Sequence, residues 1–255
     1  MSRDDLLALD IPELPLDEQR RIAAILDHAD TLRTKRRQAL AHLDTLPQAI
    51  FHQMFGGEAT TTTLGEAAEI QGGLQVSAKR GSLPLKAPYL RVANVHRGRL
   101  DLSEVKTIGC TQAEWDRTQL RGGDLLFVEG HANPLEVGRA AIWDEQVEDC
   151  IHQNHLIRAR VDPSLLLPAF AVEWFNSASG ASHFRRAGKT TSGLNTISAT
   201  TVRTAPMPLP PLEAQRTFAR RVDVTNGHRA KLTNALRRDD ALFASLQTRA
   251  FKGEL

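Results

Sequence analysis

The chain has 255 residues, of which 24% are charged, and its 32 lysine and arginine residues stand against 30 aspartate and glutamate residues. This length predicts one globular domain with additional elements or two small domains, and a net charge of +2 gives no indication of nucleic-acid binding by itself. Two cysteines, Cys110 and Cys150, exclude a disulfide framework and a four-ligand zinc site. The sequence has no long apolar run and no signal pattern, which predicts a soluble, cytoplasmic protein without a structural metal.

The two ends of the chain carry two copies of one internal repeat. Residues 11–58 align without a gap on residues 207–254 at an offset of 196, and 16 of the 48 aligned pairs are identical. The proline-rich start of each copy and its F-x-G-E end fall in register, so the similarity marks a true repeat. Prolines stop a helix from propagating backward from Leu16, and the acidic residues that follow suit the positive end of a helix. The pattern therefore predicts long helices over residues 17–55, with a kink at Pro47, and over 213–251.

Apolar residues recur along both predicted helices at alternating spacings of three and four, which is typical of a coiled-coil seam. At about 1.5 Å per residue the first helix would be roughly 58 Å long, and a helix of that length needs a partner helix. The second copy of the repeat supplies a candidate partner. The expected seam residues are Ile22, Ile25, Leu32, Leu43, Leu46 and Ile50 in the first helix and Phe218, Val222, Leu232, Leu236, Phe243 and Leu246 in the second.

The middle of the chain, residues 59–205, is rich in turns and in short segments with β-branched or aromatic residues. Such segments predict strands at 88–95, 124–130, 138–144 and 151–161, and two others predict helices at 111–120 and 168–177. We expect an α+β domain with its own core, set between the helical regions 1–58 and 206–255.

Basic and small polar residues gather in three glycine-containing loops of this middle region, at 71–82, 94–99 and 184–196. Such loops offer cationic side chains and backbone N–H groups to phosphates, and amides and guanidinium groups to base edges. Each loop taken singly is also compatible with an ordinary solvated turn. The candidate DNA-binding residues are Lys79, Arg80, Asn94, Arg97, Arg99, Arg185, Arg186, Lys189, Thr190 and Ser192.

The sequence shows no catalytic constellation. The string from Asn133 to Glu136 lacks the second proline and the aromatic residue of a base-methylating loop, so we interpret it as a turn. Asp101 and Glu104 suggest a solvated strand rather than a metal-dependent nuclease site. His152 and His155 lie three apart in a predicted strand, which favours a hydrogen-bonded core or DNA-facing role over metal binding. We therefore expect neither an enzyme nor a metal site.

Several of these strings resemble specificity subunits of type I restriction–modification systems. The resemblance rests on IPELPLDEQRRIAAILDHADTLRTKRRQALAHLD and PMPLPPLEAQRTFA in the helical regions, and on TLGEAAEIQGGL, PYLRVANVHRGRLDLSEV, GDLLFVEGHANPLEVGRAAIW, IHQNHLIRARV and TTSGLNTIS between them. It implies an antiparallel coiled coil beside a target recognition domain. It also implies a subunit without catalytic activity that recognises a bipartite double-stranded DNA site for modification subunits and, through them, restriction subunits. S-adenosylmethionine would bind to the modification subunit, and this chain would need no cofactor.

The chain departs from the family pattern, because that pattern alternates two recognition domains with two conserved helices and this chain contains one such domain. It therefore resembles a half-length or N-terminally shortened subunit. Two copies, or one copy and a partner with a second recognition domain, would restore a two-lobed reader, and a homodimer would read an interrupted palindrome. The alternative is a coiled-coil scaffold or remnant that binds modification subunits without reading DNA.

Overall fold

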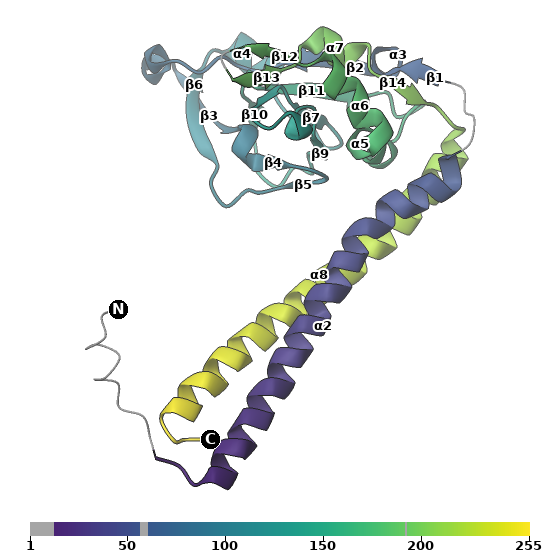
Figure 1. Ribbon diagram of the computed structural model, residues 1–255. Coiled ribbons are helices and arrows are strands. Elements are labelled where there is room, and N and C mark those ends of the chain that lie inside the picture. The colour runs from purple at the N-terminus through teal and green to yellow at the C-terminus, as the bar shows by residue number, and fades with distance from the viewer. Residues whose placement is uncertain (1–12, 57–60, 192) are drawn as a thin grey trace. The chain divides into compact units, whose positions relative to one another are not determined.

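A computed structural model describes residues 13–56, 61–191 and 193–255 of the chain (Figure 1). It divides into two compact units, and each is described by itself. Unit 1 contains residues up to Pro47 together with Asp223–Leu255, and unit 2 contains Gln48–Val222. No helix among the described residues is both long enough and apolar enough to cross a membrane.

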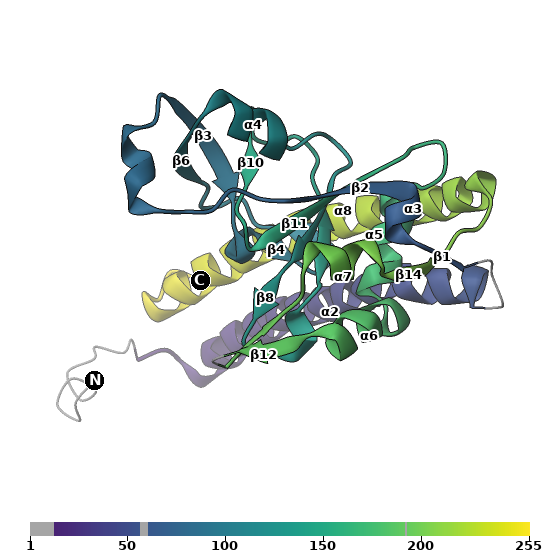
Figure 2. The same cartoon turned by 90° about the horizontal axis from the view of Figure 1, so that it is seen from above.

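Unit 1 is a pair of long antiparallel helices, formed by parts of α2 (Leu16–Phe55) and α8 (Leu212–Phe251). Both bounds agree with the prediction to within one residue, because proline precedes each helix and acidic residues occupy each first turn. Helix α2 continues through Pro47 as a single element. The two helices run side by side in both views (Figures 1 and 2).

The seam between these helices differs from the expected one at two positions. Leu32 and Leu46 are exposed, at 42% and 40% of their surface, whereas Ile22 is buried. Arginines take the place expected for leucine: the Arg36 guanidinium forms an ion pair with Asp239 at 2.5 Å, and Arg33 lies over the Phe243 ring at 4.1 Å. The heptad assignment failed here because Arg33, one residue after Leu32, takes the position at the partner helix, so the seam shifts by one residue at this point.

Two ion pairs show that the sequence repeat is also a structural repeat. The Arg33 guanidinium is 2.7 Å from the Asp240 carboxylate, and Arg229 is 3.5 Å from Asp44. Adding the repeat offset of 196 to 33 and 44 gives 229 and 240, so one pair is the repeat equivalent of the other. Because the two helices are antiparallel, the equivalence of the two ion pairs corresponds to an approximate two-fold axis between the helices. This axis passes beside Ala39 of α2 and Ala235 of α8.

Unit 2 is built on a four-stranded antiparallel sheet in the order β2 (Ala68–Gly72), β11 (Leu156–Val161), β7 (Leu125–Val128) and β9 (Ala140–Ile142). Its strands alternate between two apolar clusters, as the period of two in a strand requires. Leu125 and Phe127 of β7 face the cluster that contains helices α5 (Pro168–Asn176) and α6 (Ala178–Ala187), while Leu126 and Val128 face a second cluster around Trp143.

Smaller elements surround this sheet. Two are three-stranded sheets: β10 (Ile151–His152), β3 (Leu85–Leu90) and β6 (Lys106–Cys110) form one, and β12 (Lys189–Thr191), β13 (Leu194–Thr196) and β8 (Gly130–His131) form the other. Two are strand pairs, β4 (Val95–His96) with β5 (Arg99–Leu100) and β1 (Thr61–Thr63) with β14 (Pro206–Pro208). The short helices are α3 (Leu64–Ala67), α4 (Gln112–Thr118) and α7 (Ala199–Arg203), and the 3-10 turns are η1 (Ala78–Ser82), η2 (Val92–Asn94) and η3 (Pro134–Glu136).

Residues from both long helices help to close the core of unit 2. Phe51 of α2 and Phe218 of α8 are almost fully buried, and their rings meet edge to face at 5.5 Å. Phe170 of α5 lies 5.2 Å from Phe51. Phe218 and Val222, which the sequence assigned to the coiled-coil seam, therefore also belong to the apolar core of unit 2. The mixed α+β fold class is confirmed.

The structure corrects the third basic loop. Residues 184–187 form the last turn of α6, which begins after Ser177, whose hydroxyl accepts a hydrogen bond from the Gly180 N–H. Arg185 and Arg186 therefore lie on a helix rather than on a loop. The segment 101–105, expected as a strand, is a turn in which Asp101 accepts a hydrogen bond from the Ser103 N–H.

Candidate nucleic-acid interface

Residues 131–136, from the end of β8 through η3, form a largely exposed segment of unit 2; we call them the 131–136 segment. The Asn195 amide donates to the Ala132 carbonyl at 3.0 Å, and Arg97 donates to the Leu135 carbonyl at 2.8 Å. The Asn133 side chain accepts from the Leu135 N–H at 3.0 Å and so begins the 3-10 turn. Because β13 and the β4–β5 hairpin both bind its backbone, the second and third basic loops meet at this segment.

The base of the 131–136 segment is fixed by close packing. Gly138 has a φ of +74°, and a Cβ there would lie 2.4 Å from the Phe184 ring of α6, so both the backbone conformation and the space require glycine. Arg139, which is buried, donates to the Val95 carbonyl at 2.7 Å and forms an ion pair with Glu136 at 3.0 Å. Helix α6 and the β4–β5 hairpin therefore both pack against the turn that follows η3.

Four predicted DNA-binding arginines lie on two elements that contact this segment. Arg97 and Arg99 come from the β4–β5 hairpin, and Arg185 and Arg186 come from the last turn of α6, which packs against η3. All four side chains are exposed. Arg97 also reaches the Asn176 side-chain oxygen at 3.4 Å, and Arg185 donates to the Ala178 carbonyl at 3.2 Å, so two of the four are oriented by the fold. The structure thus brings together two elements whose arginines are almost 90 residues apart in sequence.

The arginine charges contribute to lowered pKa values at two neighbouring groups, Glu136 and His96. Burial alone would raise the pKa of Glu136, but a hydrogen bond from Arg139 and the charges of Arg97 and Arg139 hold it below its ordinary value. The pKa of His96 is lowered by burial first and then by the charges of Arg99 and Arg139. Of the arginines that contribute to these shifts, Arg97 and Arg99 are exposed and so could also contact a phosphate.

The first basic loop lies elsewhere. The Arg80 guanidinium forms a bidentate contact with Glu114 of α4 at 2.9 and 3.0 Å, and this hydrogen bond lowers the pKa of Glu114 to about 2. Lys79 is exposed on the same turn, η1. In Figure 2, η1 and its neighbours β3, β6 and α4 lie at one end of unit 2, and β12 and α6 lie at the other. Lys79 and Arg80 stay predictions for a separate contact.

Of the remaining predicted DNA-binding residues, only Asn94 has a side chain that the structure describes. Asn94 is buried, and its amide donates to the carbonyls of Asp101 and Glu104 while its oxygen accepts from the Arg91 N–H, so this side chain stabilises a turn. Lys189 and Thr190 lie on β12, whose backbone alone is described, and Ser192 lies outside the described residues.

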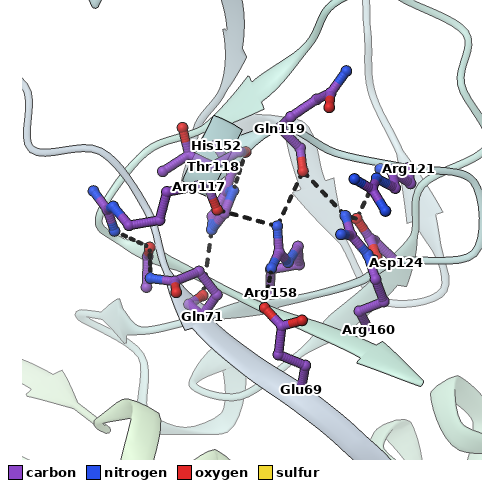
Figure 3. A network of polar contacts seen from close by, with 11 residues as sticks. Glu69, Gln71, Arg117, Thr118, Gln119, Arg121, Asp124, His152, Arg158 and Arg160 are labelled. Carbon is purple, nitrogen blue, oxygen red and sulfur yellow. Dashed lines mark hydrogen bonds and ion pairs between the residues drawn. The ribbon is translucent and has the colours of Figure 1, made fainter. Parts of the chain in front are cut away.

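Sequence reasoning missed a network of charged groups inside unit 2 (Figure 3). Arg158 and Arg160 point to the same face of β11; Arg158 is 2.7 Å from Glu69, and Arg160 binds both oxygens of the fully buried Asp124 at 2.8 Å. Both arginines also donate to the Gln119 carbonyl. The alternation of Leu156, Arg158 and Arg160 in the sequence was the available signal. Because these charges are neutralised within the fold, we assign this network to structure.

The histidines considered for metal binding are separated by the fold. His152 is fully buried, with its Nδ1 2.9 Å from the Thr118 carbonyl oxygen, whereas His155 is exposed and its ring lies 3.2 Å from Glu129. Within the part of the chain that the structure describes, no three histidine, cysteine or acidic residues gather as a metal site would require. The Asn133–Glu136 string forms the turn that the sequence predicted.

The structure thus defines a class of protein that combines a mixed α/β unit carrying exposed arginines with a pair of long antiparallel helices. No protein-family model matches the chain. Among curated proteins, the type I restriction enzyme EcoKI specificity subunit of Escherichia coli strain K12 is 29% identical over 278 residues, which cover 98% of this chain and 58% of that protein. The StySPI specificity subunit of Salmonella potsdam is 26% identical over 98% of this chain and also 58% of its own length.

The resemblance to type I specificity subunits is therefore confirmed: the homologues of this chain are such subunits. A solved structure of a type I restriction–modification system has the same fold, with a TM-score of 0.66 and 19% identity over 100% of this chain and 64% of that one. The HsdS subunit from Thermoanaerobacter tengcongensis matches with a TM-score of 0.55 and 20% identity, over 96% of this chain and 61% of its own length. This chain spans about three fifths of the length of the curated relatives that it matches.

Proposed function

We propose that this chain is the DNA-reading subunit of a type I restriction–modification system. One observation carries the proposal. Unit 2 carries the exposed Arg97, Arg99, Arg185 and Arg186 on two elements that contact the 131–136 segment, in a protein whose homologues are specificity subunits. Guanidinium groups bind phosphates and also pair with guanine edges, so such a surface suits duplex DNA.

In this function the chain binds DNA and performs no chemistry. Its partners are modification subunits, which bind S-adenosylmethionine, and restriction subunits that join through them. Support comes from the curated relatives, which are specificity subunits of restriction enzymes, and from the helix pair of unit 1, which offers a long surface for partner subunits. Because the partners would share the DNA, a net charge of +2 is sufficient for this chain.

We further propose that the active form carries two recognition units. The approximate two-fold axis of unit 1 relates the two halves of the helix pair, yet the described residues contain one α/β unit. Two copies of the chain, or one copy and a partner with a second α/β unit, give a two-lobed reader. A homodimer reads an interrupted palindrome, because a two-fold protein matches a two-fold DNA site.

Co-expression with the modification subunit of the same system, followed by mapping of methylated bases in the host DNA, tests this function directly. We expect methylation at one bipartite sequence, and a palindromic sequence identifies the homodimer. A sequence with two unlike halves identifies a partner chain. If the two proteins copurify and methylation stays absent even when a chain with a second α/β unit is supplied, the chain is a scaffold that no longer reads DNA.

The salt dependence of duplex binding tests the arginine surface itself. Replacing Arg185, Arg186 and Lys189 by alanine together should reduce the slope of log affinity against log salt by about 0.9 for each phosphate that these side chains neutralise. A control variant with Lys35, Lys231 and Arg237 replaced removes the same charge from unit 1. An equal reduction in both variants would show a non-specific effect of net charge and would remove this surface from the DNA interface.

A further inference from the structure

Leu135 is an exposed apolar side chain on a backbone that is fully restrained. Its exposure is 55%, and Pro134 beside it is exposed as well, although unit 2 buries most of its large apolar residues. The Leu135 N–H donates to the Asn133 side chain, and its carbonyl accepts from Arg97. Because both backbone groups are bonded, the turn holds the backbone of this residue so that its side chain is directed into solvent.

The groups that fix Leu135 are themselves fixed. Arg97, which holds the Leu135 carbonyl, also donates to the Asn176 carbonyl at 3.3 Å. Asn176 in turn bonds both backbone groups of Ala140 on the central sheet, at 3.0 and 2.9 Å. A chain of hydrogen bonds therefore connects the exposed leucine to a buried strand. Binding residues held in this manner lose little conformational entropy when a ligand arrives.

The surroundings of Leu135 identify the chemistry of its ligand. Exposed guanidinium groups lie on the neighbouring hairpin and on α6, and the adjacent carboxylate of Glu136 is already paired with Arg139. A ligand for this surface combines dense negative charge with a small apolar group at its centre. Duplex DNA has this combination in the major groove, where the thymine 5-methyl group is the apolar feature of the base edges.

We propose that Leu135 is a specificity-determining residue that contacts a thymine 5-methyl group in the major groove. The exposed arginines of the neighbouring hairpin and of α6 bind the flanking phosphates, and Arg97 positions the loop. This inference rests on the proposed DNA-reading function, and it adds the residue and the base that it recognises.

Thymine-to-deoxyuridine substitution provides the test, because deoxyuridine lacks the methyl group and keeps the base pairing. The mapped target duplex is prepared with one thymine replaced at a time, and affinity is measured for the chain in complex with its modification subunit. At one position the unsubstituted protein should bind about fourfold more weakly, as expected when the burial of one methyl group is removed. The Leu135→Ala complex should bind the thymine and deoxyuridine duplexes equally.

Leu165→Ala is the matched control, since Leu165 is another exposed leucine of unit 2, at 41%, on the turn between β11 and α5. This control should keep the fourfold difference. If Leu135→Ala also keeps it, or if no thymine position affects the unsubstituted protein, the inference is overturned while the DNA-reading function stands. Loss of all sequence-dependent binding in the unsubstituted complex would instead overturn both.

Discussion

At the scale of single residues, the buried carboxylate of Asp124 should be the most costly charge to remove. Asp124 is fully buried, binds Arg160 through both oxygens and accepts the Arg121 N–H. Replacement by alanine leaves the Arg160 guanidinium unpaired, and breaking a buried pair in this way costs about 3 kcal/mol. Urea unfolding followed by tryptophan fluorescence measures this cost in unit 2, because Trp115, Trp143 and Trp174 all lie there.

An exposed ion pair provides the comparison for Asp124. Arg20 and Asp17 are 3.5 Å apart with side chains that are 71% and 97% exposed, so Arg20→Ala should change stability by less than about 0.5 kcal/mol. Equal costs in the two variants would mean that the Asp124 pair contributes little beyond its surface counterpart.

His152 should make unit 2 less stable as the pH falls. Burial lowers the pKa of His152 from 6.5 to about 4, although the hydrogen bond to the Thr118 carbonyl opposes this shift. Below pH 6.5 the unfolded chain takes up a proton at this ring while the folded chain does not. The free energy of unfolding should therefore decrease by about 1.4 kcal/mol per pH unit between pH 6.5 and 4.

The His152→Gln variant separates this contribution from that of other groups. Between pH 6.5 and 5 most carboxylates stay ionised, so the variant should have a flatter stability profile than the unsubstituted protein, whatever its absolute stability. The lowered pKa of His96 contributes to both profiles equally. Parallel profiles would show that His152 is not the group responsible.

At the scale of elements, the helix pair of unit 1 distinguishes positions that the heptad pattern treats alike. Leu32→Asp should have little effect on pairing, because Leu32 is exposed, whereas Ile22→Asp should destabilise the pair by burying an unpaired charge. Circular dichroism at 222 nm during thermal unfolding measures both. A larger effect of Leu32→Asp would restore the seam that the heptad pattern predicted.

The internal repeat also supplies a matched pair of acidic residues. Asp240 binds Arg33 at 2.7 Å and Arg37 at 3.0 Å, while its repeat equivalent Asp44 has the single longer contact of 3.5 Å with Arg229 among the ion pairs of the described residues. Asp240→Ala should therefore cost about 1 kcal/mol and Asp44→Ala a few tenths, since partly exposed pairs are weak unless several charges are connected. Equal costs in thermal unfolding would contradict this ranking.

Elements with strong local signals could be predicted from the sequence, and elements that depend on distant contacts could not. Proline and acidic residues marked the starts of α2 and α8 to within one residue. Helix α6 was missed because its first turn is rich in glycine and serine; Gly180 is required there, since a Cβ would lie 2.2 Å from the Trp174 carbonyl oxygen. The position of the 131–136 segment depends on the pairing of β8 with β13, about 65 residues apart in sequence, which no local pattern encodes.

At the scale of the whole molecule, the proposed homodimer has a simple signature. Light scattering at micromolar concentration should give about twice the chain mass of 28.1 kDa, either alone or with target DNA. A monomeric mass under both conditions would exclude self-association and leave a partner chain as the source of the second recognition unit. Added modification subunit then shows whether that partner is required for assembly.

The charged face of β11 restricts how this strand can pair within the central sheet of unit 2. Arg158 and Arg160 lie on one face of this strand, and Ile157 and Ala159 lie in the apolar cluster on the other. A slip of one residue would place both guanidinium groups among the phenylalanines of α5 and α6, so only one strand register is stable. The central sheet thus resists errors of alignment during folding, and substitutions in the loops at its edges should leave the strand register unchanged.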